Sequence, residues 1–317
     1  MVAAKTATAK TLDTTALRDH FHVGGLFAPG EIRLTYSHYD RLIVGSAAPS
    51  GAPLVLIGRN TPFGRVFEAV FGFPLVFTWQ AAVVAAGFHS IPLLVKSARA
   101  ALDSAVRHAI AAGGDIDHLA LLDNICWCSS DEPERLGQLK RAMAAIYHLA
   151  KTYRTPFISG KDSMFNDFKG YDADNNPVTI SIPPTLLISG IGVMEDVAHA
   201  VSLDPKQAGD LVYLLGETKD ELGASEYYDH LGYLGNNVPD MDDQVNYKLY
   251  KALTAANKNQ LCASAIGVGF GGVGVALAKK SIAAGLGMDI TLDESLRLDK
   301  ALYSESQGRI IVTVAPQ

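Results

Sequence analysis

The stretch "TPFISGKDSMFND", residues 155–167, joins a short apolar run to a cluster of glycine, lysine, aspartate and serine. The run Phe157–Ser159 predicts a buried strand, and Gly160–Ser163 predicts a loop that opens from it. Upstream, residues 118–124 ("HLALLDN") predict another buried strand, and residues 131–153 predict an amphipathic helix between the two. This alternation indicates a mixed sheet covered by helices. We therefore expect the loop at the carboxyl end of a strand, where open α/β sheets usually bind ligands.

Capping signals set the expected helix ends. Residues 97–112 predict an amphipathic helix that Gly113–Gly114 ends. In the next helix, Asp131 is the expected N-cap and Pro133 lies in the first turn. Five residues are expected to form its apolar face: Leu136, Leu139, Met143, Ile146 and Leu149.

A domain boundary is expected near residue 206. Before it, a turn rich in Asp and Asn leads to a strand at 178–182, and "TLLISGIGVM" predicts another strand. After it come a strand in "AGDLVYLLGET", a helix at 241–258, a strand, Gly-rich turn and helix in "LCASAIGVGFGGVGVALAKKSIAAGLG", and a last strand in "GRIIVTVAP". The sequence thus predicts an α/β unit followed by an α+β unit.

The composition is that of a globular chain, with 317 residues, 48% hydrophobic and 19% charged. A net charge of -6 without a long basic run argues against nucleic-acid or anionic-membrane binding as the main activity. Three cysteines form no even disulfide framework, which favours a reducing cytoplasm, and the amino terminus lacks the apolar core of a secretory signal.

One apolar stretch, Ala69–Val95, has no Lys, Arg, Asp or Glu across 27 residues and is long enough to span a bilayer. Pro74, Pro92, Gln80 and His89 interrupt it. We therefore favour short buried strands and a packed helix over a membrane span.

The polar residues around these strands have both functional and structural interpretations. Asp123 ends an apolar strand, where it either binds a hydroxyl or metal-bound water or caps a turn. In the loop, the amides, Lys161 and Ser163 suit phosphate oxygens and Asp162 suits Mg²⁺, although a solvated turn with a salt bridge has the same composition. The glycine spacing of a Walker A loop is absent.

Two later motifs are equally open to both interpretations. The Gly-rich run 267–274 suits either a phosphate cradle or close packing, and we favour packing. The segment "YSESQGR", residues 303–309, either lines a substrate cleft or is a polar turn before a strand. The nine histidines show no metal-ligand spacing, and Cys126 and Cys128 are interpreted as unreactive.

Several motifs in order resemble phosphoribosylformylglycinamidine synthase: "ALLDNICW", "ERLGQLKRA", "TPFISGKDSMFND", "IPPTLLISGIGVMEDV", "GDLVYLLGETKDELGASEYY" and "YSESQGRIIVTVAP". The resemblance covers about residues 97–317 and is to the second half of the synthetase subunit. It implies the two-domain architecture shared with aminoimidazole ribonucleotide synthetases, an α/β ATP-binding-type domain followed by an α+β domain.

The resemblance implies a ligase that uses ATP and Mg²⁺ to convert formylglycinamide ribonucleotide into formylglycinamidine ribonucleotide with ammonia from glutamine. It places Asp123 and Gly160 at the nucleotide, and Lys161 with Asp162 in the phosphate and metal region. It also assigns a substrate contact to Ser163. From the polar segment 303–309 we expect further substrate contacts at Glu305, Ser306 and Gln307.

Five positions depart from this family. Ser104 and His108 stand where many relatives carry a Glu and an Asn that serve a magnesium-nucleotide site, and the acidic segment of the family is "AIGVGFGG" here, with Ile266, Gly267 and Phe270 at polar positions. The first half of the synthetase and any glutaminase are missing from the sequence. We therefore do not expect the complete reaction from this chain alone.

The amino-terminal residues 9–49 are similar to the beginning of 5-keto-4-deoxyuronate isomerase, a cupin-fold enzyme whose metal ligands lie in a barrel that is absent here. We expect four segments: 1–57 isomerase-like, 58–96 an apolar connection, 97–206 a partial α/β domain, and 207–317 an α+β domain.

Three hypotheses follow: part of a purine-biosynthetic amidoligase, a non-catalytic scaffold or pseudoenzyme of the same fold, and, weakest, a sugar-acid isomerase-like protein. We expect a homodimer, or association with the missing synthetase half and a glutaminase, and no binding of nucleic acid.

Overall fold

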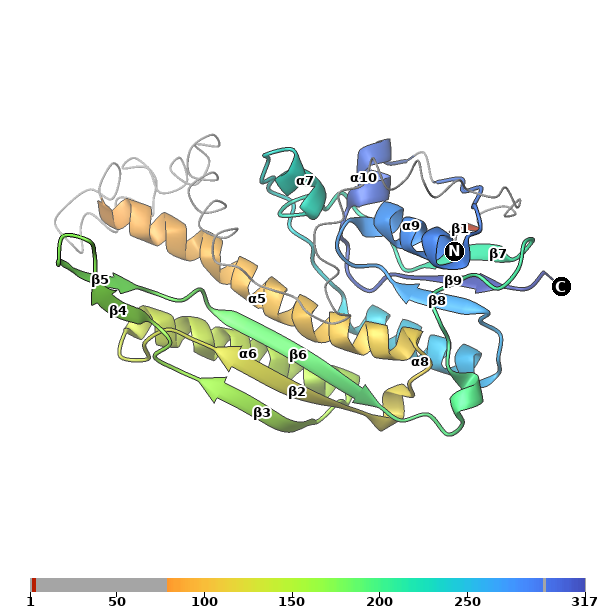
Figure 1. The fold of residues 1–317 in the computed structure, drawn as a ribbon, viewed down its shortest axis with the longest axis horizontal. Coiled ribbons are helices and arrows are strands. Elements are labelled where there is room, and N and C mark those ends of the chain that lie inside the picture. The colour runs from red at the N-terminus through yellow and green to blue at the C-terminus, as the bar shows by residue number, and fades with distance from the viewer. Residues whose placement is uncertain (1, 4–78, 293–294, 317) are drawn as a thin grey trace, which may run out of the picture.

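The computed structural model describes residues 2–3, 79–292 and 295–316 (Figure 1). Its first sheet has the order β3-β2-β6, formed by β3 (Phe157–Ser163), β2 (Leu119–Cys126) and β6 (Thr185–Gly192). β2 pairs with β3 in parallel and with β6 antiparallel. The mixed helix and strand architecture expected from the sequence is confirmed.

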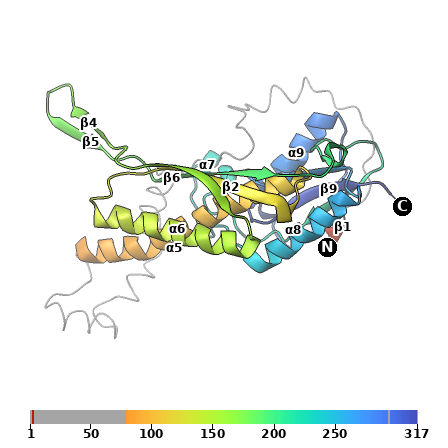
Figure 2. The same ribbon diagram turned by 90° about the horizontal axis from the view of Figure 1, so that it is seen from below.

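Two long helices cover one face of this sheet: α5 (Trp79–Ala111) and α6 (Pro133–Tyr153) (Figure 2). Because side chains alternate along a strand, the apolar side chains of β2 and β6 that face the helices are buried on one side of the sheet. Leu121 and Ile125 of β2 and Leu186 and Ile188 of β6 lie on this inner face. The opposite, outer face carries no helix among the described elements.

A second, antiparallel sheet has the order β1-β7-β9-β8. Its strands are β1 (Val2–Ala3), β7 (Leu211–Leu215), β9 (Ile310–Val314) and β8 (Ser264–Gly267). The longer helices of this part are α8 (Asp243–Lys258) and α9 (Gly272–Ala284), and the short ones are α7 (Glu226–His230) and α10 (Leu298–Tyr303). Single 3-10 turns lie at Ile116–His118 and Val197–His199.

Helix α5 joins the two halves of the core, since it contacts β6 of the first sheet and β8 of the second. It ends where the sequence predicts, because Gly113 takes a φ of 100° and a Cβ there would lie 2.8 Å from the His199 carbonyl oxygen. Trp127, Tyr153 and Tyr250 are among the largest fully buried side chains of the core around it.

A separate hairpin of β4 (Phe168–Tyr171) and β5 (Pro177–Ile180) projects beyond the first sheet (Figure 2). Its turn is the expected Asp/Asn-rich one. The Asp172 carboxylate accepts hydrogen bonds from the backbone N–H groups of Asp174 and Asn176, and Asn175 takes a φ of 62°.

Helix α5 begins earlier than expected. It runs without a break from residue 79 across residues 96–97, where the sequence suggested a change of character, and Pro92 lies inside it. The short strands expected in the apolar stretch are therefore not formed at residues 79–95, while residues 69–78 lie outside the described part. No helix among the described residues is long and apolar enough to cross a membrane. The isomerase-like residues 9–49 also lie outside the described part.

Three local predictions around the first sheet are wrong. Residues 160–163 are the second half of strand β3, so no loop opens at Gly160, and β2 continues past Asp123 to Cys126. Both strands are longer because each residue finds a partner in the parallel pairing, from Asp123 with Gly160 to Cys126 with Ser163. Helix α6 begins after Glu132 with no side-chain cap, and Leu136 is 48% exposed.

Candidate functional site

The residues Gly160–Ser163 are divided between the two faces of the sheet, because neighbouring side chains on a strand point in opposite directions. Lys161 and Ser163 lie on the outer face, in register with Asn124 and Cys126 of β2. The Lys161 ammonium donates a hydrogen bond to the Cys126 sulfur at 3.5 Å. The outer face thus presents an exposed cation and hydroxyl groups.

The inner face carries the acidic members of the set. Gly160 lies directly beside Asp123, and a Cβ at Gly160 would overlap the Asp123 carboxylate. Asp162 projects to this side too. Burial, together with the neighbouring Asp162 carboxylate, raises the pKa of Asp123. Lys161 and Asp162 therefore do not converge on one point.

Asp123 also lines an open groove of about 730 Å³ between α6 and the start of β3. The other lining residues come from the last three turns of α6 and the segment that follows it: Met143, Ile146, Tyr147, Ala150, Lys151, Arg154, Thr155, Pro156 and Phe157. The sequence marked Asp123 as a candidate but did not predict a groove, because Met143 and Ile146 were expected only as part of the apolar face of the helix.

The segment 304–309 is buried and makes internal hydrogen bonds. Ser304 Oγ accepts the N–H of Glu221 at 3.2 Å, and Ser306 Oγ accepts the N–H of Lys219 at 3.0 Å. Arg309, which is fully buried, donates to the Ser304 and Ser306 carbonyl oxygens and to Thr218 Oγ1. These groups hold the connection from β7 to α7 in place.

Glu305 occupies the start of the Gly-rich helix α9. Its Oε1 accepts the N–H groups of Gly271 and Glu226, both at 2.9 Å. Burial raises the pKa of Glu305 to about 7. Since a carboxylate of the chain itself already takes the N–H of Gly271, this geometry favours the packing interpretation of the run 267–274 over a phosphate cradle.

A buried polar cluster joins α5 to the rest of the core. The Asp103 carboxylate accepts hydrogen bonds from the hydroxyls of Tyr153 and Tyr250 at 2.6 and 2.7 Å and pairs with Arg107. Arg107 donates in turn to Gln307 Oε1 at 3.2 Å. This cluster was not predicted from the sequence, although Asp103 and Arg107 carry opposite charges four residues apart within an apolar helix, a spacing that predicts an ion pair.

The positions that depart from the family lie together, with one exception. His108 Nδ1 lies 2.7 Å from the Ser104 carbonyl oxygen, and a Cβ at Gly267 would lie 3.2 Å from His108 Nε2. Burial, followed by the charge of Arg107, lowers the pKa of His108 to about 4. Phe270, by contrast, is 46% exposed. The packed group offers no carboxylate to a metal ion.

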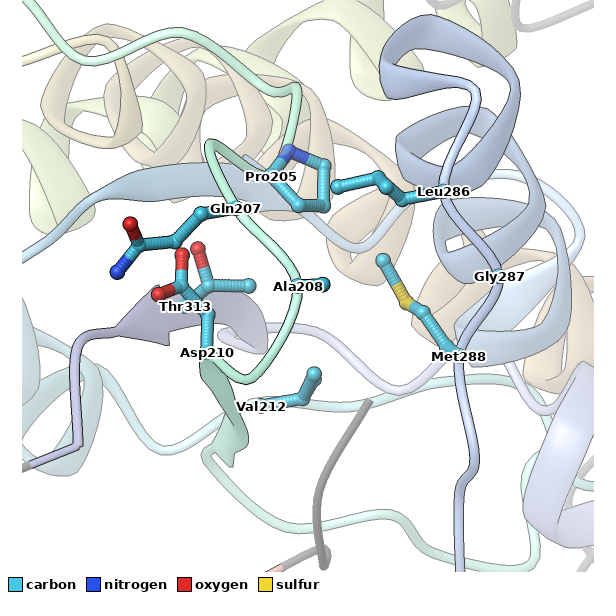
Figure 3. A pocket seen from close by; sticks show the side chains of 9 residues that line it. All are labelled: Pro205, Gln207, Ala208, Asp210, Val212, Leu286, Gly287, Met288 and Thr313. Carbon is cyan, nitrogen blue, oxygen red and sulfur yellow. The ribbon is translucent and has the colours of Figure 1, made fainter. Parts of the chain in front are cut away.

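Metal ligands are not clustered in the described part of the chain, where no three His, Cys, Asp or Glu side chains meet. The three cysteines are free. A small, partly enclosed cavity lies between β7, β9 and the end of α9 (Figure 3). Asp210 lines it at the side of Thr313, but most of its wall is the apolar surface of Pro205, Val212 and Met288.

Comparison with known proteins finds a family match for the carboxyl-terminal part of the chain. Residues 207–317 match the model of the family described as AIR synthase related protein, C-terminal domain. The chain is 30% identical over 224 residues to the phosphoribosylformylglycinamidine synthase subunit PurL of Alkaliphilus metalliredigens. That alignment covers 70% of this chain and 29% of the relative, so the chain spans under a third of that relative's length.

Solved structures also match, at lower sequence identity. PurL of T. maritima complexed with FGAR has a TM-score of 0.49 at 16% identity, over 72% of this chain and 37% of that one. E. coli HypE, a hydrogenase maturation protein, has a TM-score of 0.47 at 16% identity, over 69% and 64%.

Residues 207–317 match the AIR synthase-related family, so the resemblance drawn from the motifs is confirmed at the level of the AIR synthase-like superfamily over that segment.

Proposed function

We propose that this chain is part of an ATP-dependent amidoligase of purine biosynthesis, which converts formylglycinamide ribonucleotide into formylglycinamidine ribonucleotide with ammonia from glutamine. The observation that carries the proposal is the 30% identity over 224 residues to a PurL subunit. In that reaction ATP phosphorylates the amide oxygen of the substrate, and ammonia then displaces phosphate at the same carbon.

The outer face of the first sheet fits the phosphate groups of such a reaction. Ser159, Lys161 and Ser163 lie on the same face of β3, so an ammonium and two hydroxyls face one ligand. Lys161 would bind phosphate oxygens and offset the charge that develops during transfer, and Ser163 would orient the substrate. ATP would supply the activating phosphoryl group.

The inner face holds the groups proposed for the nucleotide and the metal. Asp123 and Asp162 provide the carboxylate oxygens that Mg²⁺ prefers, and Gly160 allows the two strands and a ligand to approach closely. These carboxylates face away from Lys161, so a metal ion held by them would lie on the other face of the sheet from that ammonium group. Buried Glu305 and Ser306 would act on the substrate only by positioning the segment 218–226.

The nucleotide proposal is tested by titrating Mg·ATP and Mg·ADP into the parent chain and into Lys161→Gln and Ser163→Ala variants. Binding that weakens about tenfold in Lys161→Gln would support it, since a charged hydrogen bond of this kind contributes about 1.5–3 kcal/mol. Absence of heat and of any thermal shift at millimolar nucleotide would contradict it. That outcome would support the second candidate, a non-catalytic scaffold of the same fold, which the packing of His108 against Gly267 favours.

We further propose that the outer face is covered by a second copy of the chain or by a missing synthetase half, in a reducing cytoplasm. Ile191 is 55% exposed on this face, beside half-buried Leu122 and Leu187. A light-scattering mass of 33.8 kDa at micromolar concentration would contradict self-association. Ile191→Lys should lower the mass of a dimer toward that value.

A further inference from the structure

Cys126 and Lys161 form a close pair on the outer face of the first sheet, near the carboxyl ends of β2 and β3. Lys161 is in register with Asn124 of β2, two residues before Cys126, so the two side chains are diagonal neighbours on one face. The Lys161 Nζ lies 3.5 Å from the Cys126 Sγ, although the two residues are 35 positions apart in the sequence. Strand pairing therefore places an amine beside a thiol.

The surroundings leave both groups available for reaction. Lys161 is exposed, and within residues 79–292 and 295–316 it forms no ion pair with a carboxylate. Cys126 is a free cysteine and is half-buried, so a small oxidant can reach its sulfur. The carboxylates of Asp123 and Asp162 lie on the opposite face of the sheet. The Cys126 sulfur is thus the contact that holds the Lys161 ammonium at this position.

The other two cysteines of the chain provide an internal comparison. Cys128 is fully buried, and burial raises the pKa of its thiol. Cys262 is half-buried, and burial raises the pKa of that thiol as well. A thiol with a raised pKa is mostly protonated at neutral pH and reacts slowly with oxidants. Selective oxidation is therefore expected at Cys126.

We propose that Cys126 and Lys161 form a modification site, at which a peroxide oxidises the thiol and the two side chains then join through a sulfur–nitrogen bond. Hydrogen peroxide converts the Cys126 thiol into a sulfenic acid and is reduced to water. The Lys161 ammonium releases a proton to solvent, and its amine attacks the sulfur. The S–N bond forms, the S–O bond breaks, and the oxygen leaves as a second water molecule.

The geometry permits this bond, and thiols would reverse it. An S–N bond is shorter than the 3.5 Å contact, but the flexible four-carbon stem of an exposed lysine can close the gap without movement of the strands. One thiol, such as glutathione, attacks the sulfur and releases the amine, which leaves a mixed disulfide at Cys126. A second thiol then restores the Cys126 thiol and leaves as a disulfide with the first.

The consequence for ligand binding rests on the proposed function. A nitrogen bonded to sulfur carries no positive charge at neutral pH, so the bridge would remove the cation proposed for the phosphate groups. Oxidation would then weaken nucleotide binding, and thiols would restore it. The exposed Ile191 is in register with Ala120, at the other end of β2 and about 20 Å from Cys126. Association through Ile191 therefore does not require that Cys126 be covered.

The first test treats the full chain with hydrogen peroxide and measures intact mass and tryptic peptides. The bridge should lower the mass by about 2 Da, join the peptides of Cys126 and Lys161 and prevent cleavage after Lys161. Dithiothreitol should reverse all three changes. Cys126→Ser and Lys161→Arg should each abolish the joined peptide, whereas Cys262→Ser is the matched control and should form it as the parent does.

The second test uses dimedone, which labels sulfenic acids, to separate capture by the amine from simple exposure of the thiol. During a short peroxide treatment, Cys126 of the parent should be labelled weakly, because Lys161 consumes the sulfenic acid. In Lys161→Arg, which keeps the positive charge, labelling of Cys126 should rise about threefold or more. Equal labelling in the two proteins would overturn the proposal.

Two further outcomes would also overturn it: absence of the joined peptide, and a disulfide between Cys126 and Cys128, which gives the same mass change but leaves the bond after Lys161 cleavable. Titration of Mg·ATP into the oxidised and reduced chains tests the consequence separately. A joined chain that binds Mg·ATP as the reduced chain does would contradict the role of Lys161 in phosphate binding and leave the modification site standing. Absence of Mg·ATP binding to the reduced chain would count against the proposed function alone.

Discussion

Two polar clusters in this chain look alike in sequence and differ in structure. Residues 160–163 ("GKDS") and residues 304–307 ("SESQ") each combine charged and hydroxyl side chains next to a strand. The first lies within the edge strand β3, and its outer side chains face solvent. The second is buried, and its polar atoms are occupied by backbone N–H groups. Polar composition beside a strand therefore does not distinguish a binding site from an internal support.

The two clusters differ in exposure because different segments of the chain pack against them. The outer face of β3 meets no other described element, so Lys161 keeps its charge available for a ligand. The segment 304–309 meets the connection 218–226 and the start of α9, whose N–H groups need acceptors. A binding cluster leaves its polar groups free, whereas a supporting cluster uses them.

The largest expected effect comes from Arg309→Met. Fully buried Arg309 donates three hydrogen bonds that hold the connection after β7, so its loss should lower the free energy of unfolding by roughly 3–5 kcal/mol. Lys161→Met, the matched change in the exposed cluster, should stay within about 0.5 kcal/mol. Urea unfolding of both variants measures the contrast, and equal losses would refute it.

Glu305 should give the buried cluster a pH dependence. Burial raises its folded pKa from 4.5 to about 7, so the folded chain binds a proton more tightly than the unfolded chain. The resulting stability is fully present below about pH 4.5 and is lost as the pH rises toward 7, by about 3 kcal/mol at most.

The pH effect is measured as the melting temperature between pH 4.5 and 8. Glu305→Gln should remove this component of the fall, whereas Glu195→Gln, at an exposed position, should keep it. A fall of the same size in Glu305→Gln would show that other groups cause it.

The smallest expected difference in stability between the two clusters is that between alanine substitutions at Gly308, beside the buried cluster, and at Gly160, in the exposed one. A Cβ at Gly308 would overlap the Asn246 side-chain amide, and its φ is 81°, so Gly308→Ala should cost about 2–3 kcal/mol. A Cβ at Gly160 would meet the Asp123 carboxylate, which has open space to turn into, so Gly160→Ala should cost under about 1 kcal/mol and mainly weaken ligand binding. Thermal unfolding of the two variants checks the order, which would reverse if Gly160 were the tighter site.

Periodicity predicted most of the regular elements. The helix at 131–153, the helix at 241–258 and the final strand were expected within a few residues of α6, α8 and β9. The errors concern ends and extensions, such as the early start of α5 and the continuation of β3 through Ser163. Strand pairing causes the second error, because residues with turn-like composition remain extended when a neighbouring strand supplies their hydrogen bonds.

The candidate sites were predictable in part. The motifs directed attention to Asp123 and Lys161, which the structure places on opposite faces of one sheet. The sequence did not show this separation, because the face that a strand residue occupies depends on the register with the neighbouring strand, which only the structure gives.

The sequence by itself determined the superfamily resemblance of residues 207–317 and the order of helices and strands, since both depend on local pattern and on the succession of motifs. Only the tertiary structure decided which polar groups are free. Lys161 is available and Glu305 is occupied because hydrogen-bond partners come from segments distant in the chain, such as Gly271 and Glu226 for Glu305. No local pattern records those partners.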